Sequence, residues 1–386
     1  MANKPFTELQ NELQQRNALG LLRQRHTLQS PQSPHITIDG KLYLSFCSND
    51  YLGLANHPQL IEALQQGAQQ FGVGAGASHL VSGHFVVHQE LEKQLAAFVG
   101  QPAALLFSTG YLANLGAVQA LVGRGDTVFA DKLNHASLND AMVLSRASIK
   151  RYRHGDITQL AQQLQQADSG RKLVITDAVF SMDGDIAPLP QLLALCEQHD
   201  AWLLVDDAHG FGVLGQQGRG SLSHFNLGSP RIIYMATLGK AAGVSGAFIA
   251  AGQIVIATLI QSARSYIYTT ASPPSLASAL LTSVRLMEQE EWRRETLRKL
   301  IAQLRTGLTG LKWILQHSDT PIQPLVIGGN QAAMDVSMAL RARGIWVPAI
   351  RPPTVPQHTA RLRISLSAAH TEPDVAQLIS ALHELA

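Results

Sequence analysis

Short apolar segments alternate with helical segments between about residue 55 and residue 250, and this alternation limits the fold more than any other feature. The apolar segments are Ala103–Phe107, Thr127–Ala130, Leu173–Thr176, Trp202–Val205 and Ile232–Met235. Helical patterns separate several of them, at Asn114–Val122, Leu160–Ala167 and Leu189–His199. Such alternation predicts an α/β fold with a mainly parallel sheet covered by helices on both faces. In these folds, ligands bind at the carboxyl ends of the strands.

The segments on either side of this region have different patterns. An N-terminal helix is expected over Phe6–His26, followed by a hairpin that turns at Asp39-Gly40. After Pro273-Pro274 we expect a long helix to about Leu308, with a possible kink at its Glu-Arg centre, and then strand, helix, strand, strand from about Pro321. This division predicts an arm over residues 1–50, a large α/β domain over 51–275, and a linking helix with a small α+β domain over 276–386.

Composition excludes several classes of protein. Hydrophobic residues make up 46% of the 386 residues and charged residues 15%, which indicates a compact enzyme and argues against disorder. Thirty basic and twenty-eight acidic residues nearly cancel, so no nucleic-acid partner is expected. Cys47 and Cys196 are far apart and are expected to be reduced thiols. There is no apolar run of about 20 residues and no signal core, so we expect no membrane association and a cytoplasmic location.

Polar residues follow the last two predicted strands where each strand ends. Trp202–Val205 is followed by Asp206, with His209 three residues later. The next strand is followed by Thr237 and then by Lys240, in a loop of small residues that gives a bulky ligand access to the lysine. A carboxylate leaving a buried strand is costly to desolvate unless a cation meets it. A desolvated lysine is neutral enough to form an imine, so these loops predict imine chemistry on Lys240.

An electron-sink cofactor held on an amine also needs an acid at its ring nitrogen, a flat group over its ring and a phosphate site. Asp206 is the candidate acid, His209 can reach a ring hydroxyl, and His135 is a flat residue in a loop after an earlier strand. The turn Ser108-Thr109-Gly110-Tyr111 lies between a strand and a helix, where backbone N–H groups bind anions, and Thr237 adds a hydroxyl. Taken singly, each residue is more simply explained as a surface, core or capping residue. The prediction rests on their joint placement.

Other polar patterns are less decisive. Arg361 and Arg363 share one face of a predicted strand, and either carboxylate binding or a solvent-facing charge explains them equally well. No clear apolar strand precedes the glycine-rich segment at 72–76, so a dinucleotide site is not expected. His84 and His88 are four residues apart, but without further ligands we expect no metal site.

Five motifs together resemble one known family. They are Ser48-Asn49-Asp50-Tyr51-Leu52-Gly53-Leu54, Asp131-Lys132-Leu133-Asn134-His135-Ala136-Ser137, Phe180-Ser181-Met182-Asp183-Gly184-Asp185, Val205-Asp206-Asp207-Ala208-His209-Gly210 and Thr237-Leu238-Gly239-Lys240. Over nearly the whole chain the sequence resembles the α-oxoamine synthases, a branch of the fold-type I, aspartate-aminotransferase-like, pyridoxal-phosphate enzymes. The resemblance implies that fold and a pyridoxal 5′-phosphate cofactor held by Lys240 as a Schiff base.

The resemblance also assigns roles to individual residues. For the cofactor it implies ring stacking by His135, a bond from Asp206 to the ring nitrogen, contacts of His209 and Ser181 with the ring hydroxyl, and phosphate binding by Gly110, Tyr111 and Thr237. For the substrates it implies that Asn49 and Arg363 hold the amino-acid carboxylate, that His135 also meets substrate, and that Arg23 and Thr354 contact the acyl group. The catalytic residues are then Lys240, His135 and Asp206, and no metal is implied. The active site of this family forms between two subunits, so a homodimer is implied, with Thr269 or Thr270 near the neighbour's phosphate.

The chain departs from the family pattern at three positions. Gly76-Ala77-Ser78 replaces a common Gly-Gly-Ser, Asp177 replaces a common Glu, and His358 stands where glycine is common. These departures concern the shape of loops and leave the cofactor residues unchanged.

The segment Ile350–Pro356 and the length of the chain most resemble the members that join L-alanine to pimeloyl-CoA, or to a pimeloyl thioester on acyl-carrier protein, with loss of carbon dioxide. The nearest alternative is the reaction of glycine with acetyl-CoA on the same fold. A non-catalytic regulator that binds the cofactor and a dinucleotide enzyme are weaker alternatives. The preferred acyl-chain length and the choice between the two thioesters are not predicted.

Overall fold

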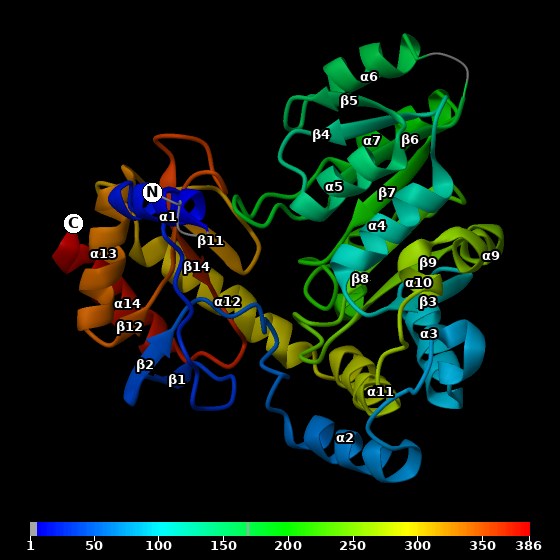
Figure 1. The fold of residues 1–386 in the computed structure, drawn as a ribbon. Coiled ribbons are helices and arrows are strands. Elements are labelled where there is room, and N and C mark those ends of the chain that lie inside the picture. Colours follow the sequence, from blue (N-terminus) through cyan, green and yellow to red (C-terminus); the bar gives the residue numbers. More distant parts are fainter. Residues whose placement is uncertain (1–5, 168–169) are drawn as a thin grey trace.

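The computed structural model describes residues 6–167 and 170–386, and a seven-stranded sheet lies at its centre (Figure 1). In spatial order the strands are β3 (Ala103–Phe107), β9 (Ala247–Ala251), β8 (Ile232–Thr237), β7 (Trp202–Asp206), β6 (Lys172–Asp177), β4 (Thr127–Asp131) and β5 (Ser148–Tyr152). β9 is antiparallel to both of its neighbours, and the other pairs are parallel. The predicted α/β fold with a mainly parallel sheet is confirmed. Two strands, β9 and the largely exposed edge strand β5, were not predicted from the sequence.

Helices cover both faces of this sheet. Successive residues of a strand point to opposite faces, so Leu204 packs in one core cluster while Val205 packs in the other. The Leu204 side is covered by α4 (Gly110–Leu121), α5 (Ala136–Ser145) and α9 (Gln253–Ser262). The Val205 side is covered by α3 (Val86–Phe98), α6 (Ile157–Gln165), α7 (Leu189–Gln198) and α11 (Pro274–Gln289). Apart from the edge strand β5, these strands are buried on both faces, which explains why they read as continuous apolar runs.

The predicted long helix after Pro273 is present and is divided in two. α11 ends at Gln289, and α12 (Glu291–Gly307) follows after Glu290, whose ψ of 65° is not helical. This break lies in the Glu-Arg region where a kink was expected. α2 (Pro58–Phe71) packs against α11, and the short helices α8 (Ser221–His224) and α10 (Arg264–Ile267) lie in the connections.

The C-terminal segment forms a smaller unit around an antiparallel sheet. Its strands, in order, are β10 (Ile314–Leu315), β11 (Ile322–Gly328), β14 (Ala360–Ser365) and β13 (Ala349–Ile350), accompanied by α13 (Asn330–Ala342) and α14 (Glu372–Leu385). The sequence analysis did not predict α14. The N-terminal hairpin of β1 (His35–Ile38) and β2 (Lys41–Ser45) joins this unit, because β2 pairs with β12 (Ile345–Trp346).

The N-terminal helix is shorter than expected. α1 spans Thr7–Ala18 and not residues 6–26, because Gly20 adopts a left-handed conformation (φ 63°) and the residues that follow it are not helical. Leu9 and Leu13, the residues that suggested an apolar face, are each 55% exposed. The extent predicted for this helix was therefore wrong.

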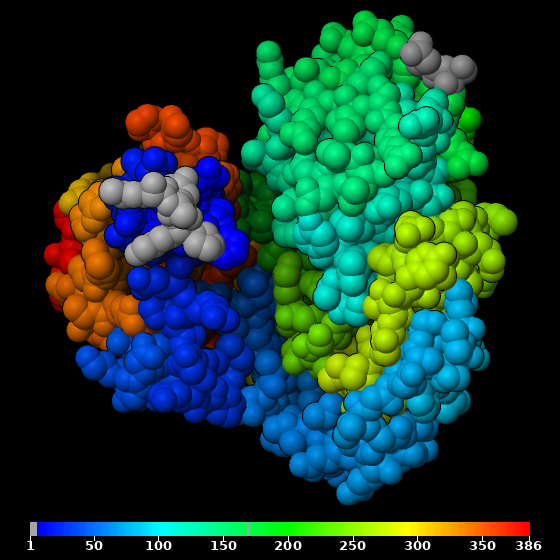
Figure 2. Space-filling model, viewed as in Figure 1, coloured from blue at the N-terminus to red at the C-terminus, as the bar shows by residue number. Residues whose placement is uncertain are grey.

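Two lobes meet along a hollow in the surface (Figure 2). One lobe contains the seven-stranded sheet, and the other contains the C-terminal unit with the N-terminal hairpin (Figure 1). The carboxyl ends of β4, β6, β7 and β8 point toward this hollow, so the loops that follow these strands lie between the lobes (Figure 1). Within the described residues, every helix is too short or too polar to cross a membrane.

Candidate active site

Lys240 lies in the loop that follows β8, with its amine next to His209. The Nζ atom is 2.8 Å from His209 Nε2. Burial lowers the pKa of Lys240 to about 8, and the nearby Arg363 guanidinium acts in the same direction, while Asp206 and Asp177 oppose the shift. A lysine with such a pKa has a substantial neutral fraction near neutral pH, which is the form that attacks a carbonyl group.

Asp206 is the last residue of β7, and its carboxylate is buried. Its Oδ2 accepts a hydrogen bond of 2.7 Å from Asn114 Nδ2, and its Oδ1 accepts one of 3.0 Å from the backbone N–H of Ala208. Asn114 also donates to Ser137 Oγ at 2.9 Å. These bonds orient the carboxylate without neutralising its charge. Asn114 was given no role from the sequence, although it lies three residues after the proposed phosphate turn, on the helix that begins there.

His135 caps the first turn of α5, and neighbouring groups fix its position. Its backbone N–H donates to Asp177 Oδ2 at 2.7 Å, and its Nδ1 accepts from the backbone N–H of Ser137 at 3.2 Å. Burial lowers the pKa of the imidazole, and Lys240 lowers it further, whereas Asp206 opposes the shift. His135 is therefore mainly neutral at pH 7, and Nε2 is the nitrogen that carries its hydrogen.

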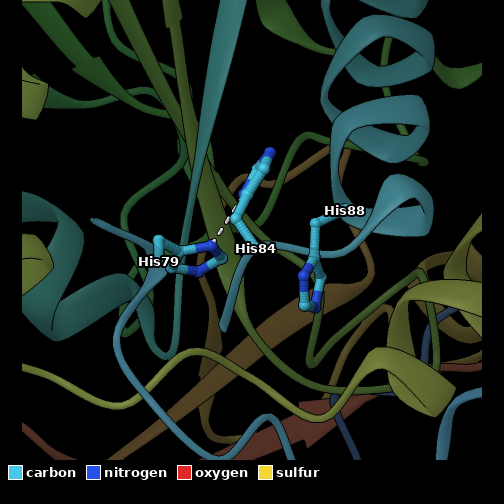
Figure 3. Close-up of side chains that lie close together, drawn as sticks. All are labelled: His79, His84 and His88. Atoms are coloured by element: carbon cyan, nitrogen blue, oxygen red, sulfur yellow. Dashed lines mark hydrogen bonds between the residues drawn. The ribbon is translucent and has the colours of Figure 1, made fainter. Parts of the chain in front are cut away.

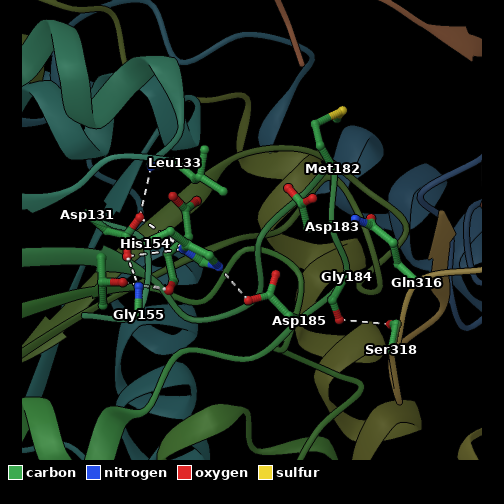
Figure 4. Close-up of polar contacts among 12 residues, drawn as sticks. Asp131, Leu133, His154, Gly155, Met182, Asp183, Gly184, Asp185, Gln316 and Ser318 are labelled. Carbon is green, nitrogen blue, oxygen red and sulfur yellow. Dashed lines mark hydrogen bonds and ion pairs between the residues drawn. The ribbon is translucent and has the colours of Figure 1, made fainter. Parts of the chain in front are cut away.

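An ion-pair network holds the loop before His135 (Figure 4). His154 Nδ1 is 3.1 Å from Asp131 Oδ1, and His154 Nε2 is 2.8 Å from Asp185 Oδ2. Asp131, at the end of β4, also accepts bonds from the backbone N–H groups of Leu133 and Gly155. The network therefore connects the loop of His135 to the loop 181–185. His154 was not predicted as a site residue, since nothing in the sequence places it near these loops.

The predicted phosphate turn forms the start of α4. Thr109 is the N-cap, and its Oγ1 accepts a hydrogen bond from the backbone N–H of Leu112 at 3.2 Å. Gly110 and Tyr111 are the first two residues of the helix, where free N–H groups favour an anion. The Tyr111 hydroxyl donates to Asp140, which raises the pKa of the tyrosine. A methyl group added at Gly110 would lie 3.7 Å from Thr237 Cβ, so Thr237 lies beside this helix start.

Arg363 is a buried arginine on β14 that faces the large domain. It is 6% exposed; its Nε donates to the carbonyl of Ser181 at 2.6 Å, and one terminal nitrogen donates to Asn49 Oδ1 at 3.1 Å. A second terminal nitrogen lies 3.4 Å from the Tyr51 hydroxyl. Arg361, 3% exposed on the same strand, instead pairs with Asp183 at 2.6 Å. The alternative that these two arginines form a solvent-facing charged surface is therefore excluded.

One cavity of about 780 Å³ brings most of the predicted residues together. Seven of them line it: Asn49, His135, Ser181, His209, Lys240, Thr354 and Arg363. Asp206, Gly110, Tyr111 and Thr237 do not line the cavity and belong to the strand and helix ends around it. Arg23 is exposed in the extended segment after α1 and is not among the lining residues. The roles of these residues therefore remain proposals.

Two more acids are buried beneath the cavity. Asp177 is adjacent to Asp206 in the sheet, and burial together with that neighbouring carboxylate raises its pKa well above the usual value. Burial raises the pKa of Asp207 to about 7, although Ser221 and Tyr234 donate hydrogen bonds to its Oδ2. Asp177 accepts the backbone N–H of His135 and Asp207 accepts that of Ser221, so these two carboxyls hold neighbouring loops in place.

The other candidates from the sequence are not organised as nucleotide-binding elements. Gly72 ends α2, so the glycine-rich segment 72–76 follows a helix and not a strand. This arrangement agrees with the expectation that it is not a dinucleotide site. His358, where the family pattern has glycine, adopts a left-handed conformation with φ of 62°, which explains why glycine is common there.

The donor set suits a flat, anionic, aldehyde-bearing cofactor. Lys240 offers a partly neutral amine, Asp206 an oriented carboxylate, His135 and His209 two imidazoles, and α4 an anion-binding helix start. These residues fit pyridoxal 5′-phosphate, with Lys240 at its aldehyde, Asp206 at its ring nitrogen and the start of α4 at its phosphate.

Comparisons with known proteins agree with this arrangement. A sequence model of the family "Aminotransferase class I and II" matches residues 42–382. The 8-amino-7-oxononanoate synthase of Nitrosomonas europaea is 63% identical over 384 residues, covering 99% of each chain. Among solved structures, the serine palmitoyltransferase of S. paucimobilis with bound PLP–myriocin aligns with a TM-score of 0.93 and 30% identity, covering 98% of this chain and 96% of that one. The 8-amino-7-oxononanoate synthase of Francisella tularensis aligns with a TM-score of 0.78 and 31% identity, covering 89% and 97%.

Proposed function

The chain belongs to the class I and II aminotransferase family of pyridoxal-phosphate enzymes, and from this premise we propose that it joins L-alanine to pimeloyl-CoA. The α-carbon of alanine forms a bond to the pimeloyl carbonyl carbon, coenzyme A leaves, and the alanine carboxylate is lost as carbon dioxide. The product is 8-amino-7-oxononanoate, an intermediate of biotin biosynthesis. The enzyme is thus a C-acyltransferase that acts with decarboxylation.

One observation carries this proposal: Lys240, Arg363 and a group of apolar residues line the same cavity. Pro348, Ile350, Pro353, Val355 and Pro356 form an apolar wall, together with Met182 and Leu133. The Arg363 guanidinium can bind the carboxylate of an amino acid, and the apolar wall can contact the methylene chain of an acyl group.

Each residue has a physical task in this reaction. Arg363 holds the alanine carboxylate, and Asn49 and Ser181 fix the guanidinium through hydrogen bonds to its nitrogens. Lys240 Nζ removes the α-proton of alanine, since its lowered pKa leaves the amine free to accept a proton. Asp206 keeps a proton on the ring nitrogen of the cofactor, and bound pyridoxal phosphate supplies an electron sink for the negative charge left on the α-carbon.

His135 and the acyl-binding residues complete the assignment. The neutral imidazole of His135 covers the ring face of the cofactor, and its Nε2–H can assist proton transfer to the product. Thr354 and Arg23 contact the acyl thioester in this proposal, and His209 and Ser181 meet the ring hydroxyl. Gly110, Tyr111 and Thr237 hold the phosphate.

The lysine assignment is tested by reduction. Borohydride treatment of the yellow enzyme, followed by peptide mapping, should place the cofactor on Lys240, and Lys240→Ala should remove the visible absorbance. A label on another lysine would overturn the assignment. The matched control is Lys132→Ala, because Lys132 also lines the cavity and should not carry the label.

The substrates are tested by steady-state assays that release free coenzyme A. Alanine with pimeloyl-CoA should be the best pair, and acyl-CoAs with shorter and longer chains, as well as pimeloyl-acyl-carrier protein, should be compared with it. Glycine with acetyl-CoA, the reaction of 2-amino-3-ketobutyrate CoA ligase, is not favoured by the 63% identity to a synthase of the alanine type. A larger kcat/KM for glycine with acetyl-CoA would reverse this choice.

We also propose a homodimer with a shared active site that works in the cytoplasm, where coenzyme A thioesters are available. The segment at Thr270 forms a β-bridge with Ser78 and is the part of the chain assigned to the neighbour's phosphate. Light scattering should give twice the mass of the 41.7 kDa chain. Mixing Lys240→Ala with Thr269→Ala/Thr270→Ala should restore activity above that of either variant, because one of the two sites in a mixed dimer then keeps both groups.

A further inference from the structure

Three histidines outside the cavity converge on one point (Figure 3). His79 begins a short π-helical turn over His79–Gly83, His84 follows this turn directly, and His88 lies in the first turn of α3. One ring nitrogen from each lies within 4.8 Å of the others, and the Nδ1 atoms of His79 and His84 are 2.9 Å apart. The sequence spacing showed only His84 and His88. The fold adds His79, and it also shows that His84 lies before the start of α3, whereas His88 lies on that helix.

The contact between His79 and His84 is of a kind that an ion can replace. At 2.9 Å one Nδ1 carries the shared hydrogen and the other accepts it. If both rings carry their hydrogen on Nε2, two lone pairs point into the same space. Nitrogen ligands about 2.0–2.1 Å from a zinc ion, in tetrahedral arrangement, lie a little over 3 Å from each other. The two rings are therefore spaced for a common ion with little movement.

The third histidine is held by the kind of contact that orients metal ligands. His88 Nε2 donates to the carbonyl of Ser272 at 3.0 Å, which leaves the lone pair on Nδ1. Nδ1 now accepts the backbone N–H of Phe85 at 3.1 Å. For His88 to bind a metal through Nδ1, the hydrogen bond from the Phe85 N–H to this nitrogen must break. Phe85 lies at the start of α3, where backbone N–H groups have no partner within the helix. His79 is also held in place, since its ring stacks on Tyr266 with centroids 5.1 Å apart.

The surroundings of His79 and His88 disfavour a charged ring, and a neutral imidazole is the form that binds metal. Burial lowers the pKa of His79 to about 4, and the other two histidines act in the same direction. Burial and His84 also lower the pKa of His88. Three imidazoles this close cannot all be protonated without strong repulsion, whereas a divalent ion turns their proximity into an attraction.

An ion has a route to this point. A cavity of about 590 Å³ is lined by His79 and His84, together with Glu92, Tyr266 and residues of the 101–105 segment. His79 and His84 are partly exposed, while His88 is buried behind them. A water molecule in this cavity can supply a fourth ligand.

We propose that His79, His84 and His88 form a binding site for a divalent transition-metal ion of the zinc type. Three imidazoles and one water give a tetrahedral set, and imidazole nitrogen selects zinc, cobalt, nickel or copper over magnesium or calcium. The ion ties the segment 79–84 to the start of α3 and, through the Ser272 carbonyl, to the chain beside Thr270. This site is separate from the cofactor cavity and does not depend on the proposed reaction.

The test uses the cofactor-loaded enzyme and cobalt(II) as the probe. We expect one cobalt per chain with intense d–d bands of a tetrahedral ion at wavelengths longer than the cofactor absorbance. His79→Gln and His84→Gln should each weaken binding by about 100-fold or more, and the double variant should lose the bands. Both side chains are partly exposed, so these variants are expected to fold. His224→Gln, a change of an exposed histidine on α8, is the control and should bind cobalt as the unchanged chain does.

Two results would overturn the proposal. The first is cobalt binding that is equally weak in the unchanged chain and in the double variant, which would mean an adventitious ion only. The second is an X-ray absorption spectrum of the zinc-loaded enzyme that requires fewer than three imidazoles, since His88 would then keep its bond to Phe85. All variants carry the cofactor, so any cobalt that the cofactor itself binds is the same in each. The difference in cobalt binding between the unchanged chain and the histidine variants therefore reports on the histidines alone.

Discussion

His209 Nε2 lies 2.8 Å from Lys240 Nζ, while Nδ1 of the same ring lies 2.6 Å from the Tyr51 hydroxyl. Burial and the positive charges of Lys240 and Arg363 lower the pKa of His209 well below its usual value. A neutral imidazole can accept from the hydroxyl at one nitrogen and face the amine with the other. The lysine is therefore held by a chain of contacts that begins in the Asn49–Tyr51 segment.

Tyr51→Phe tests this chain of contacts. The substitution removes the hydroxyl that contacts His209 Nδ1, Asn49 Oδ1 and Arg363, and leaves buried polar groups without a partner. Such a loss costs about 1–3 kcal/mol, so kcat/KM for alanine should fall by about 5- to 150-fold. Tyr43→Phe is the matched control, because Tyr43 packs with Ile36 and Ile38 in the small unit. Equal effects of the two changes would contradict the role given to Tyr51.

The reactivity of Lys240 should depend on pH with a midpoint near 8. The pKa of Lys240 is lowered from its usual 10.5 to about 8, chiefly by burial, and the neutral amine is the reactive form. When cofactor is added back to the stripped enzyme, the rate at which visible absorbance forms should rise from pH 6 to pH 9 and then level off. A rate that keeps rising to pH 10 or above would show that the amine is not desolvated.

Arg363→Lys should raise the KM for alanine by about 10- to 100-fold, because a lysine cannot reproduce the forked hydrogen bonds to a carboxylate. The KM for pimeloyl-CoA should change much less, since the surface proposed for the acyl group is the apolar wall at Pro348, Ile350 and residues 353–356. Steady-state kinetics with each substrate varied in turn separates the two effects. An unchanged alanine KM would remove Arg363 from the carboxylate site.

His154→Gln should destabilise the protein in a pH-dependent way. Hydrogen bonds to Asp131 and Asp185 raise the pKa of His154 from 6.5 to about 10. Because the folded pKa is the higher one, the stabilisation is fully present below about pH 6.5 and is lost as pH rises toward 10. The side chain is 33% exposed, so after allowance for solvent screening we expect a difference on the order of 1 kcal/mol.

Denaturant unfolding at pH 6, 8 and 10 checks this expectation. The difference between His154→Gln and the unchanged chain should shrink toward pH 10. His317→Gln, at an exposed position, serves as the control and should show no such trend. A difference that is constant across this range would indicate lost packing in place of a lost ion pair.

Gly243→Ala should disturb the loop that carries Lys240. Gly243 has φ of +70°, and a Cβ at this position would lie 2.6 Å from the carbonyl carbon of Leu54. The steric clash and the left-handed conformation together cost about 2–4 kcal/mol. Gly239→Ala in the same loop is the matched control, because its nearest neighbour would be 3.8 Å away. Thermal unfolding of both variants should show a clear loss for Gly243→Ala only.

Local patterns predicted much of the fold and part of the site. The strands that end at Asp206 and Thr237 are buried on both faces, so their apolar runs were visible without a structure. Edge strand β5 was missed because Ser148, Lys150 and Arg151 interrupt its apolar pattern. The end of α1 was placed too late because the chain turns at Gly20. The family resemblance was confirmed, and it named Arg363 and Asn49, which lie 314 residues apart in the chain and share a hydrogen bond.

The sequence alone determined that Asp206 and Lys240 follow successive strands, because parallel strands end at one edge of a sheet and a short apolar run fixes where each strand ends. Only the tertiary structure decided what surrounds them. The pKa of Lys240 depends on burial and on Arg363 from the other lobe, and Asn114, Tyr51 and His154 gain their roles from contacts across large sequence separations. The convergence of His79 with His84 and His88 likewise depends on how a π-helical turn meets α3, since the spacing of residues along a chain does not determine the distance between side chains in space.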